Sequence, residues 1–382
     1  MNVETKFFLR KKFKEYYWDA KVPAPPSVHR REFGVGTLED KIKVRHKSFA
    51  SERELSTFLK REAPSYISYS SAYYEFPANQ PMESKNWLGA DLVFDLDAPM
   101  SYFDSGVFDN VKREALNLVD FLVSDFGFGR EEAKINFSGS KGYHLHIYSE
   151  DVRHLSGEER SEIVDYVTGL GLSLEYFMED VSVEGVVSNR DGKYVQPASV
   201  VKGPTARDVG RARKIYDSVH DFVVNSDLAD FERIEGIGPK RAGKLLKEKG
   251  KNVKAIEDGN WEGVRELTPK LLQKIVNEKA IQLTGDADKM VTIDTARLMR
   301  LPDTLHGGSG LSAVDVGKIE DFNPLVDAVV FSEEKTKIRT TEDITKFDLM
   351  ENKWGPYKKE DVISLPEYVS VYLMLKNVAE KS

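Results

Sequence analysis

Residues 92–98 read LVFDLDA, and this stretch indicates both a β-strand and a candidate metal-binding site. Successive side chains of a strand point to opposite faces of its sheet. The alternation predicts one buried face, made by Leu92, Phe94 and Leu96. It places Asp95 and Asp97 together on the other face, roughly 6.8 Å apart. Two carboxylates at this spacing can converge on a pair of divalent cations, as in nucleotidyl transfer. Their hard oxygen atoms suit Mg²⁺ or Mn²⁺, and a solvated acidic strand face is the alternative.

A third carboxylate stands far away in the sequence. Residues 291–308 read VTIDTARLMRLPDTLHGG, in which Asp294 lies in a β-branched run that favours another strand. Such a strand would bring a third carboxylate to the metal platform. The cations that follow, Arg297 and Arg300, together with His306, are suited to contacting phosphate groups.

A glycine-rich segment, SGSKGYHLHI at 138–147, predicts a loop followed by an alternating strand. Small residues let backbone N–H groups approach an anion, and Lys141 adds the positive charge that a triphosphate requires. No helix follows a Gly-Lys-Ser/Thr ending, so this is not a Walker A loop. A tight hairpin loop is the simpler alternative. His144 and His146 share a strand face and form a second alternative, a metal pair that would need a third protein ligand.

Composition narrows the class of protein. The chain has 382 residues, which favours two or three folding units. No apolar run approaches the ~20 residues of a membrane span, and the charged N-terminus lacks the features of a signal peptide. The absence of cysteine excludes disulfides, thiol catalysis and the usual zinc ligands. A cytoplasmic location is expected. The net charge of −8 does not by itself indicate a nucleic-acid binder, although local basic patches can serve one.

The order of the expected elements, with strands interleaved with helices, predicts an α/β (α+β) core. Helices are expected over 5–17, 51–63, 110–126 and 156–178, with a hairpin between 31 and 49. The catalytic core is expected over 1–225 and 285–382, with strands returning near Asp294 and a helical tail after residue 340. Residues 230–280, rich in Lys and Glu, are expected to form a small all-helical inserted domain.

The insertion begins with FERIEGIGPKRAGKLLKEKG at 231–250, which has the pattern of a helix-hairpin-helix. The residues expected to contact DNA are Gly236, Gly238, Lys240 and Arg241. In such motifs the N–H groups of the turn meet a DNA phosphate at a helix N-terminus. Residues 231–254 hold eight Lys or Arg against three Glu, a local charge of +5. A helical decoration with solvated lysines is the alternative.

Taken in order, these motifs resemble the catalytic (small) subunit of archaeal and eukaryotic DNA primases. The resemblance also includes HRREFG at 29–34 and VRHKSF at 44–49, and extends to GGSGL at 307–311. It spans residues 1 to about 215 and 287 to about 332. It implies the primase catalytic fold, with a mixed β-sheet flanked by helices. It also implies the synthesis of short primers from ribonucleoside triphosphates, in archaeal members often from deoxynucleotides too.

The resemblance also implies roles for individual residues. The metal-binding catalytic residues would be Asp95, Asp97 and Asp294. Contacts to the triphosphate would come from Ser138, Lys141 and His144, with Arg300 and His306 adding positive charge and a donor, and Arg45 lying close to the same site. Asp91 falls outside the motif.

Three features depart from the family pattern. Ser140 and Lys141 stand where the family usually has arginine at one or both positions, and lysine keeps the charge without the bidentate geometry. The family's HGKTG is His306–Gly310 here, without its lysine. The cysteine-rich zinc knuckle of many members has no counterpart, so no zinc is expected.

The implied partners are a primase large subunit, which often carries an iron–sulfur cluster, single-stranded DNA template, and NTPs or dNTPs. No membrane partner is expected, and the cytoplasmic protein would be nucleoid-associated. Two other functions stay open: a repair-type primase-polymerase of the same superfamily, and a non-catalytic nucleic-acid-binding relative.

Overall fold

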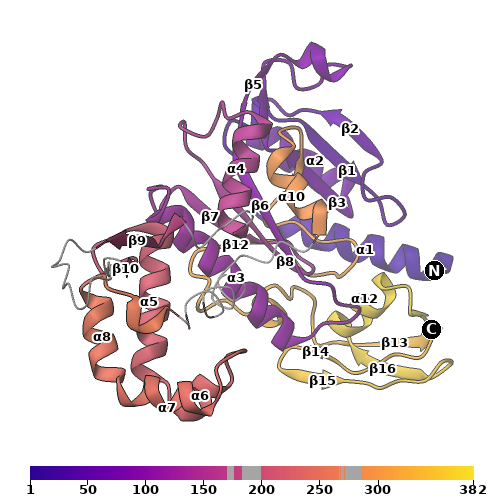
Figure 1. The fold of residues 1–382 in the computed structure, drawn as a ribbon. Coiled ribbons are helices and arrows are strands. Elements are labelled where there is room, and N and C mark those ends of the chain that lie inside the picture. The colour runs from indigo at the N-terminus through magenta and orange to yellow at the C-terminus, as the bar shows by residue number, and fades with distance from the viewer. Residues whose placement is uncertain (170–175, 183–198, 266, 268–270, 272–284) are drawn as a thin grey trace, which may run out of the picture. The chain divides into compact units, whose positions relative to one another are not determined.

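The computed structural model describes residues 1–382 except 170–175, 183–198, 266, 268–270 and 272–284 (Figure 1). The chain divides into two compact units. Unit 1 contains Met1–Val119, Phe128–Val164 and Gln282–Ser382, and unit 2 contains Asp120–Gly127 and Asp165–Ile281. The insertion expected over 230–280 falls inside unit 2, and part of it lies outside the described residues. None of the described helices is both long and apolar enough to span a bilayer.

The first sheet of unit 1 is antiparallel, with the strand order β11-β3-β1-β2. Its strands are β1 (Phe33–Gly36), β2 (Val44–Lys47), β3 (Tyr66–Ser70) and β11 (Leu298–Arg300). β1 and β2 form the hairpin that the sequence predicts. Phe33 of β1 packs edge-on against Phe49, whose ring also meets Phe58 of α2 (Glu52–Glu62). Aromatic burial therefore joins this sheet to α2.

The second sheet carries the candidate carboxylates. Its order is β12-β7-β8-β6, and all of its pairs are antiparallel. The strands are β6 (Leu92–Asp97), β7 (Ala133–Phe137), β8 (Gly142–Ile147) and β12 (Val314–Val316). Leu92, Phe94 and Leu96 are buried, as the alternation predicts. Among the described strands β6 is an edge strand, so one side of it pairs with no described strand.

The other strands of unit 1 belong to smaller sheets. β13 (Lys335–Thr340) pairs with β16 (Val362–Pro366) and β17 (Ala379–Lys381). Two further hairpins join β4 (Ala72–Tyr74) to β5 (Trp87–Ala90) and β14 (Phe347–Leu349) to β15 (Asn352–Trp354).

The helices of unit 1 include α1 (Val3–Asp19), α2, α10 (Gly285–Ile293), α11 (Pro324–Asp327) and α12 (Glu367–Leu375), with most of α3 (Ser105–Ser124) and α4 (Gly157–Thr168). α2 begins at its predicted cap: the Ser51 hydroxyl accepts the Glu54 N–H, and the Glu54 carboxylate accepts the Ala50 N–H.

Two predictions about secondary structure are wrong. The β-branched run before Asp294 is the helix α10, not a strand, because Val291 packs in one buried cluster with Val93 and Met299. Packing of this kind outweighs the weak β preference of Val, Thr and Ile. The tail after residue 340 is not mainly helical either, because it contains the strands β14, β15, β16 and β17 and the single described helix α12.

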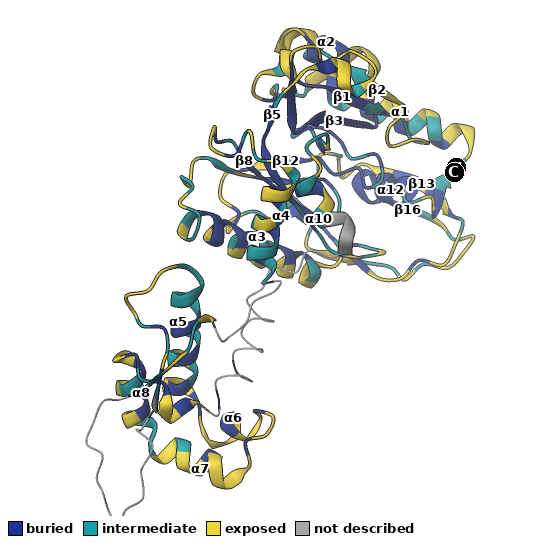
Figure 2. Cartoon of the chain, turned by 45° about the horizontal axis from the view of Figure 1, so that its top comes forward, coloured by how far each residue is buried: buried dark blue, intermediate teal, exposed yellow. Residues whose placement is uncertain are grey.

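Unit 2 has its own core around Trp261, which is fully buried and donates its indole N–H to the Pro204 carbonyl at 3.0 Å. Its described elements are β9 (Glu179–Ser182), β10 (Ser199–Lys202), α5 (Gly210–Asn225), α6 (Leu228–Glu232), α7 (Pro239–Lys247) and α8 (Lys249–Glu257). α6 and α7 are joined by a turn that contains Gly236 and Gly238. Most of α7 is exposed (Figure 2).

Candidate functional site

The register between β6 and β8 builds the centre of the candidate site. Asp95 lies opposite His144, and Asp97 lies opposite Gly142. His144 Nε2 is 3.5 Å from Asp95 Oδ1, and the imidazole is buried while both carboxylates are half-buried. Burial lowers the pKa of His144 to about 4, although the Asp97 carboxylate acts in the opposite direction. His144 is therefore neutral at pH 7 and has one N–H to donate.

Gly142 is required where it stands. A Cβ atom at this position would lie 1.8 Å from the Leu96 carbonyl oxygen and 2.7 Å from Asp97 Oδ1. The glycine thus lets the loop between β7 and β8 approach the Asp97 carboxylate closely.

The loop itself is a tight hairpin connection. The Ser138 N–H donates to the Gly142 carbonyl at 2.9 Å, and the Gly142 N–H donates to the Ser138 hydroxyl at 3.3 Å. Gly139 adopts a positive φ of 79°, and a Cβ there would lie 2.9 Å from the Cβ of His306. The interpretation of this segment as a tight hairpin loop is therefore correct. A contact between this loop and a phosphate group stays a prediction.

A second set of predicted residues converges on the same place. His306 starts a turn in which its Nδ1 accepts the Gly308 N–H at 3.2 Å. Tyr66 meets the imidazole edge-on at 5.3 Å, and the Arg300 guanidinium lies 5.0 Å from the Tyr66 ring centroid. Burial lowers the pKa of His306 well below its usual value, and Arg300, Lys41, His144 and Lys141 act in the same direction. The charge of Arg300 thus acts on both imidazoles, and that of Lys141 acts on His306.

Burial also lowers the pKa of Arg300, to about 10. The guanidinium stays charged at neutral pH, and its half-buried position strengthens its interaction with an anion.

Arg45 lies on β2, where it is held by a residue that the sequence did not single out. Its Nε donates to Glu32 Oε1 at 2.9 Å, and the fully buried Glu32 also accepts the His46 N–H. Burial raises the pKa of Tyr74 to about 12, with Glu32, Arg45 and Asp294 as the acting charges. Arg45 and Asp294 therefore lie around the same phenol.

Asp294 itself directly follows α10 and is exposed. Its Oδ1 accepts the Ala296 N–H at 2.9 Å. Throughout the described part of the chain, no three His, Asp or Glu side chains are gathered as a metal-binding group. The geometry supports a pair of carboxylates on β6, whose hard oxygen donors fit Mg²⁺ or Mn²⁺. The three-residue metal centre is still a prediction.

Asp91, which lies beside this strand but outside the motif, has a structural partner. The Arg31 guanidinium donates to Asp91 Oδ2 at 2.7 Å, and the Tyr73 hydroxyl donates to Oδ1 at 2.7 Å. Arg31 also donates to the carbonyl groups of Ser70 and Ser71, and both members of the ion pair are buried. The pair ties the start of β6 to the first sheet.

The residues predicted to contact DNA lie in unit 2. Gly236 has a positive φ of 84°, and Gly238 begins α7 with no side-chain cap. Lys240 and Arg241 are exposed in the first turn of α7. The described geometry is a pair of helices joined by a turn that contains both glycines, and the helix-hairpin-helix motif stays a prediction.

Comparisons with known proteins agree with the sequence resemblance. A family model described as DNA primase small subunit matches residues 94–317. A DNA primase small subunit of Methanococcoides burtonii is 35% identical over 399 residues, covering 100% of this chain and 99% of the relative. Those of Methanothrix thermoacetophila and Halobacterium salinarum are each 34% identical, and in both cases 100% of each chain is covered.

Proposed function

Since this chain belongs to the DNA primase small subunit family, we propose that it synthesises short RNA primers on single-stranded DNA by nucleotidyl transfer. Deoxynucleotides are a second class of substrate to test. The observation that carries the proposal is the pairing of Asp95 and Asp97 with His144 and Gly142 across β6 and β8. Carboxylates, neutral imidazoles and cations converge there from separate segments of the chain.

In the proposed reaction the 3′-hydroxyl oxygen attacks the α-phosphorus of the incoming nucleotide, and pyrophosphate leaves as the α–β bond breaks. Asp95 and Asp97 would hold Mg²⁺ or Mn²⁺, which when bound lowers the pKa of the attacking hydroxyl and offsets triphosphate charge. We expect Asp294, near the same face, to complete this ligand set.

The protein's own cations would stabilise the leaving group. Lys141 and Arg300 would offset the negative charge that builds up on the phosphate oxygens in the transition state. His144 and His306, both neutral, can each donate one hydrogen bond to a phosphate oxygen without adding charge. Arg45, held by Glu32, would orient the nucleotide from the side of β2.

The test is primer synthesis on single-stranded DNA with Mg²⁺ or Mn²⁺ by the wild type and by Asp95→Asn and Asp97→Asn. We expect losses of at least about 100-fold, the scale of removing a main electrostatic contribution to the transition state. Asp321→Asn is the control, since Asp321 is an exposed aspartate of unit 1. Unchanged synthesis in both variants would refute the carboxylate assignment.

The same assay separates the competing functions. Given a gapped duplex as a second substrate, a repair-type primase-polymerase would fill the gap more efficiently than it starts a primer on single-stranded DNA. A non-catalytic relative would do neither and would still bind DNA.

We further propose that the chain works with a primase large subunit and that the turn of α6–α7 grips template phosphates. Gly238 has a negative φ, and a Cβ there would meet no atom within 4 Å, so Gly238→Val fills the approach to the turn without straining it. DNA affinity should fall in this variant and not in Gly250→Val, at an equally open glycine of α8. Equal affinities would favour the alternative of a helical decoration.

A further inference from the structure

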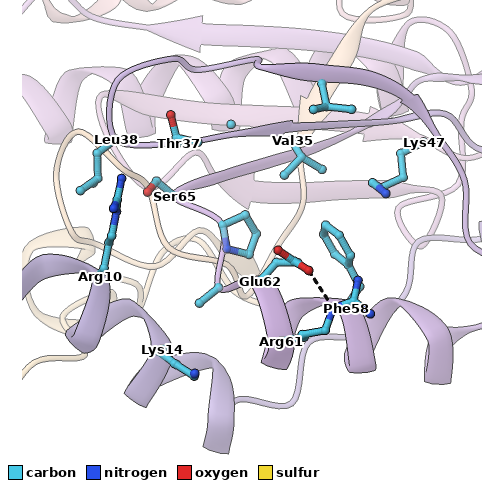
Figure 3. Close-up of a pocket in the computed structure, with 14 residues that line it drawn as sticks. Arg10, Lys14, Val35, Thr37, Leu38, Lys47, Phe58, Arg61, Glu62 and Ser65 are labelled. Atoms are coloured by element: carbon cyan, nitrogen blue, oxygen red, sulfur yellow. Dashed lines mark hydrogen bonds and ion pairs between the residues drawn. The ribbon is translucent and has the colours of Figure 1, made fainter. Parts of the chain in front are cut away.

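A groove outside the candidate site lies in unit 1 between α1, the β1–β2 hairpin and α2 (Figure 3). Its volume is about 540 Å³. The apolar part of the lining comes from Val35, Leu38, Val44, Phe58 and Pro64. Arg10 and Lys14 of α1 stand at one end, and Lys47 and Arg61 stand at the other. The groove therefore combines an apolar floor with cations at both ends.

A second cavity, of about 390 Å³, adjoins the first. The two share Lys47, Phe58 and Arg61, and the second adds Arg53. Together they make a cationic path along α2 that is longer than one pocket.

The charge along this path is opposite to that of the chain as a whole, which is −8. The basic lining residues of the two cavities are Arg10, Lys14, Lys47, Arg53 and Arg61. The acidic lining residues are Glu54 and Glu62. Both carboxylates are already engaged: Glu62 Oε1 lies 2.7 Å from Arg61 Nε, and Glu54 accepts the Ala50 N–H at 2.7 Å.

Three of the cations have no carboxylate partner within the described part of the chain. Lys14 and Arg53 are exposed there, and Lys47 lies 4.9 Å from the Phe58 ring centroid. The pair of Arg10 with Glu39 is long, at 3.8 Å, and exposed, so it holds Arg10 only weakly. These side chains are available to an anion from outside.

We propose that this groove binds single-stranded nucleic acid beyond the reaction centre, with Lys14, Lys47 and Arg53 contacting backbone phosphates. Cations spread over two adjoining cavities suit an extended polyanion better than one compact phosphate, and the apolar floor suits sugars and bases. Lys47 lies two residues beyond Arg45 on β2. A nucleic-acid strand that leaves the candidate site along β2 therefore meets the groove. The inference rests on the proposed function, because the ligand is the template or primer of that reaction.

The test measures binding of a fluorescein-labelled oligothymidine to the full chain by fluorescence anisotropy over a range of KCl concentrations. The variant is Lys14→Gln/Lys47→Gln. Each phosphate contact to a single strand contributes about 0.7 to the slope of log affinity against log salt. Loss of two contacts should make the slope shallower by about 1.4 and weaken binding about 20-fold at 0.1 M salt. The matched control is Lys335→Gln/Lys337→Gln, two exposed lysines of β13 in the same unit.

Affinity and slope equal to those of the control would overturn the proposal. So would loss of large-subunit binding with DNA affinity intact, because the groove would then be a protein-docking site. The proposed function is tested by a different result. Asp95→Asn should keep its DNA affinity and lose primer synthesis. If the wild type makes no primers, the comparison of DNA affinities still tests the groove.

Discussion

Replacing Gly142 with alanine tests whether the β6–β8 register positions the candidate catalytic carboxylates. The added Cβ would lie 1.8 Å from the Leu96 carbonyl oxygen, whereas carbon–oxygen contacts between strands are ordinarily about 3.3 Å or longer. The strands must therefore separate by roughly 1.5 Å at this point. The obstructing atom is backbone, so no side-chain rotation can relieve the overlap.

Two consequences follow, on different scales. Overpacking of this kind costs about 1–3 kcal/mol of stability. The same Cβ would lie 2.7 Å from Asp97 Oδ1, so the carboxylate is displaced as well. A displacement of about 1 Å in a reacting group can cost roughly 100-fold in rate. We expect Gly142→Ala to lose about 100-fold in primer synthesis even at temperatures where the protein stays folded.

The measurement pairs thermal unfolding with turnover at saturating nucleotide. The matched control is Gly317→Ala, because a Cβ at Gly317 meets no atom within 4 Å in the same unit. If Gly142→Ala unfolds and turns over like Gly317→Ala, the proposed role of the register is wrong. A loss of stability without a loss of turnover would show that the glycine serves the fold alone.

Three further predictions concern other parts of the chain. Burial lowers the pKa of His144 from 6.5 to about 4, so below pH 6.5 the unfolded chain binds a proton that the folded chain does not. In urea unfolding, this group alone should lower the free energy of unfolding by about 3 kcal/mol between pH 6.5 and 4. His144→Gln should lack this pH-dependent loss. Wild-type and variant curves of stability against pH that run parallel would contradict the prediction. Asp91→Ala leaves the Arg31 guanidinium buried without its carboxylate, so it should lower the free energy of unfolding by about 3–5 kcal/mol in denaturant titrations. The double variant Asp91→Ala/Arg31→Met should recover part of this stability. A loss below about 1 kcal/mol in the single variant would disprove the burial argument. Gly243→Ala adds a methyl group in open space within α7 and should stabilise unit 2 by about 1 kcal/mol in calorimetry, whereas a lower transition temperature would show a hidden contact.

Much of the local structure could be predicted because its signals lie within a few residues. The alternation in 92–98 correctly predicts β6 and its buried apolar face. Ser51 and Glu54 correctly mark the start of α2. The loop between two strands at 138–142 is likewise present as a hairpin connection.

Predictions that depend on distant contacts were less successful. Asp294 sits in a run with strand-like composition, yet Val291 packs against Val93, about two hundred positions earlier in the sequence, and the segment is helical. Glu32 carried no local sign that it would be buried beneath Arg45. Asp91 is separated from Arg31 by 60 residues, so its structural role was invisible to any short pattern.

The sequence by itself determined the strand at 92–97 and the loop and strand at 138–147. It also determined which residue types bring carboxylate, imidazole and cationic groups to the site. Motif order also identified the family. Only the tertiary structure decided that Asp95 faces His144, that Gly142 must lack a side chain beside Asp97, and that Asp294 follows a helix. The physical reason is the distance along the sequence over which each interaction acts. Alternation and capping act over a few residues of one segment, whereas register, burial and pKa depend on which remote side chains pack against that segment.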